Sequence, residues 1–228
     1  SSDLQKARRY SHCCGGATWS TTSRNCLSDA LTSHIDLVPS LLSLAGVTAD
    51  QAATFAGRSL PGKDISAAIG STNRDQHLVR NAALFTYSGI ATNDADLIQL
   101  VAEARAAGKD PKEELKRTGF KPNLKKRGTL RSAFDGRYKL NRYFSPLDHS
   151  QPKDVDELFK WSDVELFDLS RDPHELYNLA TDKDAHKEQL TAMNKTLNQL
   201  IKDEFGKDDG GELPDLPGVT WTIDRIDM

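Results

Sequence analysis

The sequence is short of cysteine, of long apolar runs and of charge of one sign, and each shortage excludes a class of protein. Its three cysteines all fall within the first 26 residues, which is not how the disulfide framework of a secreted domain is distributed. It has no run of about 18 apolar residues, and its start lacks the charged and apolar regions of a signal peptide. Thirty basic residues nearly balance 33 acidic ones, so the charge gives no reason to expect nucleic acid or a membrane as partner.

What remains is the composition of a soluble globular protein. The 228 residues are 37% hydrophobic, which is enough for one moderate core or two small ones. The cytoplasm and the periplasm both stay open as its location, and the oligomeric state is open as well.

The first regular pattern predicts a short helix. Leu37, Leu41 and Leu44 recur on one helical face, and Asp36 or Ser33 can cap its start. Further along, residues 57–70 are rich in Gly and Ser and predict an irregular connection that ends in a short helical turn.

The middle of the chain predicts one strand and two helices. Residues 77–89 are apolar and aromatic, which favours a buried strand that ends at Gly89. Residues 94–107 and 110–119 have helical spacing and helix-start signals, and both helices are expected on the surface.

The strongest local signal is a β-hairpin around Asp135-Gly136, flanked by two strand-like runs. A further strand is predicted at Val164 to Leu169, extending the same antiparallel sheet. A long amphipathic helix, 184–205, is expected to cover one face of that sheet, and residues 218–228 alternate as in an edge strand. In the second run of the hairpin, the alternation separates Tyr138, Leu140 and Arg142 from Lys139 and Asn141.

Several groups of side chains carry chemistry in principle, and a structural role is the better interpretation of each. His12, Cys13, Cys14 and Cys26 lack the paired spacing of a tetrahedral zinc site. His34 and Asp36 could form an acid/base pair, but an Asp before an apolar helix is more often its cap.

A structural role is also the better interpretation of two clusters of charged residues. The basic stretch at 121–127 (Lys121, Lys125, Lys126 and Arg127) lacks the aromatic residues or Gly-rich loop of an anion site, so a solvated connection is favoured. Asp168, Asp172 and Glu175 do not have the spacing of a calcium-binding EF-hand loop, and an Asp-Pro turn explains them. The sequence therefore predicts no catalytic, cofactor-binding or metal-binding residue in this chain.

Two blocks of the sequence are informative together: "SDALTSHIDLVPSLLSLAGV…GRSLPGKDI" and, further along the chain, "LRSAFDGRYKLNRYFSP…VELFDLSRDPHELYNLA". In this order and spacing they resemble the C-terminal part of bacterial-type arylsulfatases of the alkaline phosphatase superfamily. The first block is similar to that family's SHxDLxPTLLxLAG helix. The second is similar to its R-x-x-x-x-GRYK strands and the ELFDLxxDPxExxNLA segment after them. The resemblance covers about Ser28 to Phe205.

The resemblance implies an α/β fold class, as an α+β fragment of a larger enzyme. Residues 27–90 would end the large α/β domain, and residues 91–228 would form a C-terminal subdomain with a short antiparallel sheet packed by the helix at 184–205. Residues 1–26 fit neither part and form an atypical, frameshifted or disordered segment.

The resemblance also implies sulfate ester hydrolysis, in which the complete enzyme needs a formylglycine nucleophile and a Ca or Mg ion. Sulfatases make formylglycine from a C/S-x-P-x-R motif. The stretch "SLPGK", Ser59 to Lys63, approaches that motif, but Lys63 replaces the Arg and the surroundings are those of a turn. The chain thus looks like a fragment without its reaction centre, with a sulfate ester as partner only of the complete enzyme.

The stretch "KARRYSHCCGGATW" stands where related sulfatases have an apolar strand. When Asp3 to Ser20 is back-translated and read from the second base of each codon, a sequence such as "TYKRHVVIPIVVxxPG" is permitted. We therefore interpret residues 1 to about 25 as frameshifted translation, which the coding DNA can test. Two other functions remain open: a non-catalytic α+β module that binds or assembles, and a phosphate or phosphonate ester hydrolase of the same superfamily.

Overall fold

The computed structural model describes residues 28–69, 71, 73–89, 94–121 and 123–211. The chain divides after Asn81 into two compact units, which we call unit 1 (up to Asn81) and unit 2 (from Ala82). The frameshift prediction for residues 1–25 and the edge strand predicted at 218–228 lie outside the described residues.

Unit 1 consists of short helices and turns. In chain order these are η2 (His34–Asp36), α1 (Leu37–Leu44), α2 (Ala49–Ala56) and η3 (Ser66–Ala68). The predicted helix at Leu37 to Leu44 and the helical turn in residues 57–70 are therefore confirmed. The helix α2 was not predicted, although Thr48 and Gln51 form a capping box at its start, which is a readable helix signal.

A close approach of two backbone segments shapes unit 1. A Cβ atom placed on Gly62 would lie 1.9 Å from the carbonyl oxygen of Ile35, so only glycine fits there. Next to it, the Lys63 backbone N–H donates a hydrogen bond to Asp36 Oδ1 at 2.7 Å. The stretch "SLPGK" is therefore a turn held against η2.

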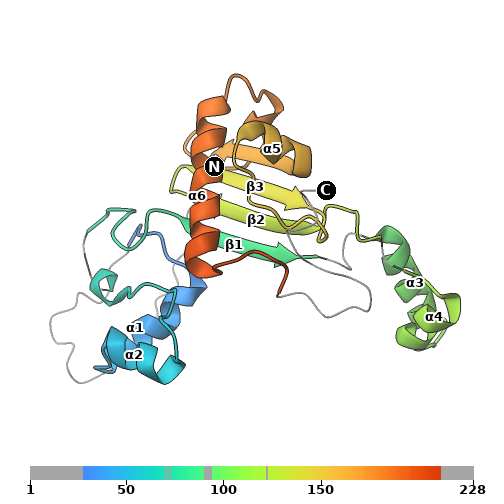
Figure 1. Ribbon diagram of the computed structural model, residues 1–228, viewed down its shortest axis with the longest axis horizontal. Coiled ribbons are helices and arrows are strands. Elements are labelled where there is room, and N and C mark those ends of the chain that lie inside the picture. Colours follow the sequence, from blue (N-terminus) through green and yellow to red (C-terminus); the bar gives the residue numbers. More distant parts are fainter. Residues whose placement is uncertain (1–27, 70, 72, 90–93, 122, 212–228) are drawn as a thin grey trace, which may run out of the picture. The chain divides into compact units, whose positions relative to one another are not determined.

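Unit 2 is built on a four-stranded antiparallel sheet with the order β1-β2-β3-β4 (Figure 1). The strands are β1 (Ala83–Ser88), β2 (Thr129–Phe134), β3 (Tyr138–Phe144) and β4 (Asp163–Asp168). The Asp135-Gly136 turn joins β2 to β3 as predicted, and Gly136 takes a φ of 97°, which an Asp-Gly hairpin turn requires.

The prediction that residues 77–89 form a buried strand is wrong in one respect. Among the described strands β1 pairs only with β2, and so it lies at the edge of this sheet. Phe85 is 58% and Tyr87 46% exposed. Apolar and aromatic composition predicted the strand correctly, but it does not report whether both faces of the strand are covered.

The helices of unit 2 are α3 (Ala95–Ala106), α4 (Pro111–Thr118), α5 (Val155–Trp161) and α6 (Lys187–Glu204), with a short η4 (Leu179–Thr181). Three of them were predicted, and α6 begins three residues after the predicted start at 184. The helix α5 was missed because it has only seven residues, although the Asp154 side chain caps its first turn.

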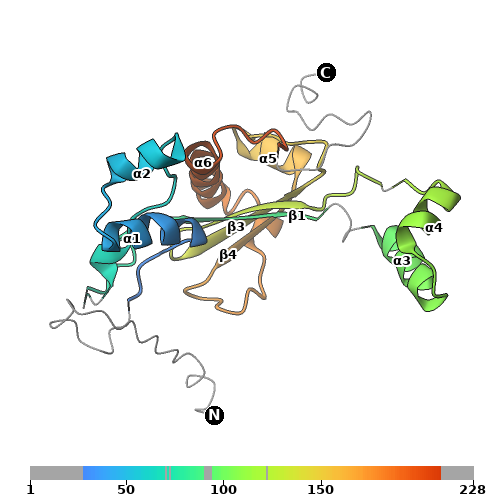
Figure 2. The same ribbon diagram turned by 90° about the horizontal axis from the view of Figure 1, so that it is seen from below.

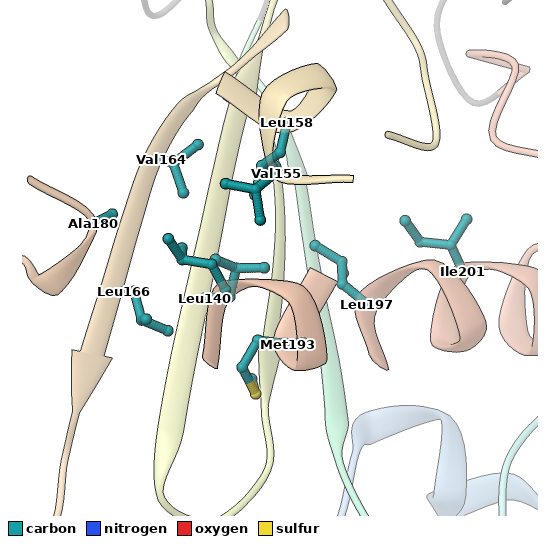
Figure 3. Close-up of a cluster of buried hydrophobic side chains, with 11 residues drawn as sticks. Leu140, Val155, Leu158, Val164, Leu166, Ala180, Met193, Leu197 and Ile201 are labelled. Atoms are coloured by element: carbon teal, nitrogen blue, oxygen red, sulfur yellow. The ribbon is translucent and has the colours of Figure 1, made fainter. Parts of the chain in front are cut away.

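The helix α6 crosses one face of the sheet, and α5 packs beside it on that face (Figure 2). The core lies between them and the strands (Figure 3). Strand residues Leu140 and Leu166 and helix residues Leu158, Leu190 and Leu197 are all 0% exposed. The alternation predicted for β3 therefore holds for Leu140, and the α+β architecture of a short sheet packed by a long helix is confirmed.

Candidate functional site

Asp36 and His34 do not form an acid/base pair. Asp36 is fully buried and accepts hydrogen bonds from the Ser33 backbone N–H at 2.7 Å and from Arg80 Nε at 3.0 Å, and Arg80 Nη2 donates to its other oxygen. His34 is exposed at the surface. Asp36 makes no side-chain cap to α1, but it is the N3 residue of a capping box that Ser33 begins at the start of η2. Its larger role is to neutralise a buried arginine.

The stretch from Ser59 to Lys63 borders a cavity of about 300 Å³ in unit 1. Ser59, Leu60 and Gly62 line it together with Asp64, whose pKa is lowered by a hydrogen bond from the Ser43 hydroxyl. No base among the described residues is hydrogen-bonded to the Ser59 hydroxyl, so their arrangement around the cavity does not activate a nucleophile.

The basic stretch at 121–127 does not converge on one point. Lys126 Nζ donates to Asp94 Oδ1 at 3.1 Å, whereas Arg127 Nη2 donates to the Lys160 carbonyl at 3.2 Å and Nη1 to Asp163. Lys126 and Arg127 thus have separate acceptors, as expected of a solvated connection.

The three acidic residues near the end of β4 also serve separate purposes. Asp168 binds Arg137, whose hydrogen bond holds the Asp168 pKa well below its usual range. Asp172 accepts from the Tyr177 backbone N–H at 2.8 Å, and Glu175 binds Lys139. Apart from the gaps given above, residues 28–211 contain no group of three His, Cys, Asp or Glu side chains that could hold a metal ion. His12, Cys13, Cys14 and Cys26 lie outside the described residues.

The charged site that sequence reasoning missed is buried in unit 2 between the sheet and the end of α6. Arg131 Nε and Nη2 donate to the two oxygens of Asp208 at 3.0 and 2.9 Å, and His149 Nδ1 lies 3.0 Å from Asp208 Oδ1. All three side chains are 0% exposed. Burial disfavours the Asp208 carboxylate, but the hydrogen bonds from His149 and Arg131 outweigh it and lower its pKa to about 2.

Aromatic rings enclose this ion pair. The Arg131 guanidinium lies 5.6 Å from the Phe144 ring centre and 5.4 Å from that of Phe205, within the range of cation–π attraction. The Phe144 and His149 rings meet edge to face at 5.2 Å. Because no atom of the Asp208 carboxylate reaches solvent, this site can anchor the segment after α6 but cannot exchange protons with a substrate.

A second buried arginine, Arg142, stands directly opposite Arg131 on β3. Its Nη1 donates to the side-chain oxygens of Asn194 and Asn198 at 3.2 and 2.9 Å. The amide nitrogens of both asparagines donate to the Pro152 carbonyl at 2.7 and 2.8 Å, which fixes the amides with their oxygens toward Arg142. Burial lowers the pKa of Arg142 to about 10, so the side chain stays charged at neutral pH.

The opposite face of the sheet carries a polar ladder beside the exposed aromatic residues of β1. The Ser132 hydroxyl donates to Asn141 at 2.7 Å, Asn141 donates to Glu165 at 2.9 Å, and the Tyr143 hydroxyl donates to the same carboxylate at 3.1 Å. Burial and the Glu165 charge raise the pKa of Tyr143 to about 12. The ladder satisfies its own hydrogen-bonding groups and stabilises the sheet.

Comparison with known proteins finds that this chain is similar to parts of larger proteins. No family model and no curated protein matches the sequence. Among solved structures, one match is a protein in complex with its substrate D-glucosamine-2-N,6-O-disulfate, at 14% identity and a TM-score of 0.44 over 78% of this chain. A second is a protein from glycosaminoglycan metabolism in Bacteroides thetaiotaomicron, at 18% identity and a TM-score of 0.48 over 82%.

A third match is a protein described as a sulfatase of Bacteroides thetaiotaomicron, at 18% identity and a TM-score of 0.41 over 80% of this chain. This chain is similar to part of a sulfatase. It spans 25%, 30% and 27% of the three matched chains. Among the residues that the structure describes, no helix is long and apolar enough to cross a bilayer.

Proposed function

We propose that this chain is the C-terminal part of a sulfatase-type ester hydrolase and has no activity by itself. The observation that carries the proposal is the ordered pair of sequence blocks, "SHIDLVPSLLSLAG" and "ELFDLSRDPHELYNLA", which resemble that family at the expected spacing. The second block forms β4 and the turns that follow it.

The described residues do not fit the groups that sulfatase chemistry requires. The formylglycine nucleophile and the Ca or Mg ion of the family have no counterpart among them, because Lys63 replaces the motif arginine and metal-capable side chains do not cluster. In our proposal these groups belong to a preceding catalytic region, and the present chain supplies scaffold and one wall of the cleft.

The experiment compares the 228-residue chain alone with a longer protein, in which residues 28–228 follow the in-frame coding sequence that precedes Ser28 in the gene. Nitrophenyl sulfate is the substrate, and released nitrophenol is measured with and without a chelator. We expect no turnover from the chain alone and chelator-sensitive turnover from the longer protein. Turnover by the chain alone would contradict the proposal.

A second candidate function is a non-catalytic binding or assembly module, favoured because the acidic residues near the end of β4 have separate partners and the described residues contain no metal-capable cluster. If no C/S-x-P-x-R motif precedes Ser28 in the gene, this candidate replaces the first. Nitrophenyl phosphate in the same assay tests the third candidate, a phosphate or phosphonate ester hydrolase, because the C-terminal scaffold does not determine the nucleophile.

A further inference from the structure

In the part of the chain that the structure describes, three arginines are almost completely buried, and two of them bind a carboxylate in the same way. Arg80, 7% exposed, uses Nε and Nη2 to hold the two oxygens of Asp36. Arg131, 0% exposed, uses Nε and Nη2 to hold the two oxygens of Asp208. This edge of the guanidinium presents two parallel N–H groups, the geometry that suits a bidentate anion.

Arg142, 1% exposed, differs from the other two at that edge. Its Nη1 is bound by the two asparagines, but Nε and Nη2 have no hydrogen-bond partner among the residues that the structure describes. Buried N–H groups without partners are costly, and a buried charge costs more unless an opposite charge accompanies it. The asparagine side chains are polar but uncharged, so they do not neutralise the positive charge of the guanidinium.

The buried carboxylate that acts on Arg142 is already occupied. Asp208 attracts Arg142 at a distance, yet its two oxygens accept from Arg131 and one of them also from His149. Arg131 opposes Arg142 across the strands and repels it. Among the described residues, no negative charge therefore neutralises Arg142 between β3 and α6.

Three more polar groups in this part of unit 2 lack partners within the described residues: Thr129 Oγ1, His149 Nε2 and Ser162 Oγ. Thr129 on β2 stands opposite Phe144 on β3. Because side chains two residues apart on a strand point to the same face, Thr129, Phe144 and Arg142 share one face of the sheet. His149 contacts Phe144 through its ring edge. Hydroxyl groups can turn their hydrogens toward an acceptor, so the Thr129 and Ser162 hydroxyls are available as further donors.

We propose that the Nε–Nη2 edge of Arg142 binds a small anion of the size of chloride or formate inside unit 2. The anion accepts both parallel N–H groups, as Asp36 and Asp208 do on the other two arginines. Its size follows from burial, since Thr129 and His149 are 0% exposed and Arg142 only 1%, which leaves no route for a bulky ester. The site is independent of the proposed hydrolase function.

The test is the urea unfolding of the full chain at constant ionic strength, with chloride or formate replacing gluconate. Because the anion binds the folded state, the unfolding constant should fall about tenfold for each tenfold rise in anion concentration above its dissociation constant. Gluconate is too large to enter. Arg142→Met should abolish the dependence, and the exposed-site control Arg171→Met, which removes the same charge, should keep it.

Two outcomes would overturn the site: a wild-type chain equally stable in chloride, formate and gluconate, or an anion dependence that persists in Arg142→Met. If Arg142→Met does not fold, crystals of the wild-type chain grown in bromide decide the question. A bromide anomalous peak within hydrogen-bond distance of Arg142 Nε and Nη2 supports the proposal, and density for water alone at that place refutes it.

Discussion

Unit 1 and unit 2 bury different kinds of side chain. Unit 2 buries a continuous apolar cluster between α6, α5 and the sheet. Unit 1 buries the ion pair of Asp36 and Arg80, while the larger apolar side chains of its helices stay exposed. These exposed side chains are Leu37, Val38, Leu41, Leu44 and Phe55.

The difference shows how each unit is stabilised. Burial of apolar area contributes roughly 25 cal/mol for each Å², so the cluster in unit 2 can support its own fold. A buried ion pair fixes geometry, but its Coulomb attraction is largely offset by the loss of hydration. We therefore expect unit 2 to hold most of the stability of the chain and unit 1 to depend on one pair of charges.

The largest effect is expected from Asp36→Ala. The substitution leaves the Arg80 guanidinium, 7% exposed, without its buried carboxylate, which typically costs about 3–5 kcal/mol. Native-state hydrogen exchange should show the amides of α1 and η3 losing protection while those of β3 keep theirs. The control is Asp29→Ala, which removes the exposed pair with Arg74 and should cost at most about 1 kcal/mol. Equal effects of the two variants would contradict this view of unit 1.

Leu197→Ala tests unit 2 in the same way. Leu197 lies on α6 and is 0% exposed within the core cluster (Figure 3), so the cavity that it leaves should cost about 2–5 kcal/mol. Urea unfolding followed by the circular dichroism of the sheet and α6 measures the loss. A cost below about 1 kcal/mol would mean that the cluster is not the main source of stability in unit 2.

Acid should weaken unit 2 through Asp208. Its pKa lies at about 2 in the folded chain against an ordinary value of 3.8, so the folded state binds protons less readily than the unfolded one. The stability from this carboxylate is fully present above about pH 4 and is lost as pH falls toward 2, a change of about 2–3 kcal/mol. Urea unfolding of the wild type and of Asp208→Asn between pH 5 and pH 2 isolates the pH-dependent contribution of this carboxylate to the free energy of unfolding. An equal pH dependence in both proteins would show that Asp208 contributes nothing.

Local signals in the sequence predicted the elements of unit 2 well. Asp135-Gly136 predicts its hairpin because few residue pairs suit that turn, and the spacing of Leu190, Met193 and Leu197 predicts α6 because it repeats over several turns. The helices α2 and α5 were missed, since eight and seven residues are too few for a periodic pattern to stand out, and only their caps mark them.

The buried charged site was not predictable in the same way. Arg131 and Asp208 are 77 positions apart, and no local pattern links them. The alternation of β3 placed Arg142 on the same side as Leu140, which was a readable signal of burial. The sequence pattern did not reveal the partners of Arg142, because the asparagines of α6 reach it only in the folded chain.

The smallest effect is expected from Leu41→Ala, which makes the same change as Leu197→Ala in the other unit. Leu41 is 65% exposed on α1, and it loses little buried area when it is truncated. Alanine also has a higher helix propensity than leucine, so the free energy of unfolding should change by no more than about 0.5 kcal/mol. Hydrogen exchange of the α1 backbone amides, compared with the wild type, measures this change in free energy. A loss of more than about 1.5 kcal/mol would show that Leu41 is covered in solution. The apolar side chains of unit 1 would then be buried by an outside contact, and the two units would not differ in whether they bury apolar surface.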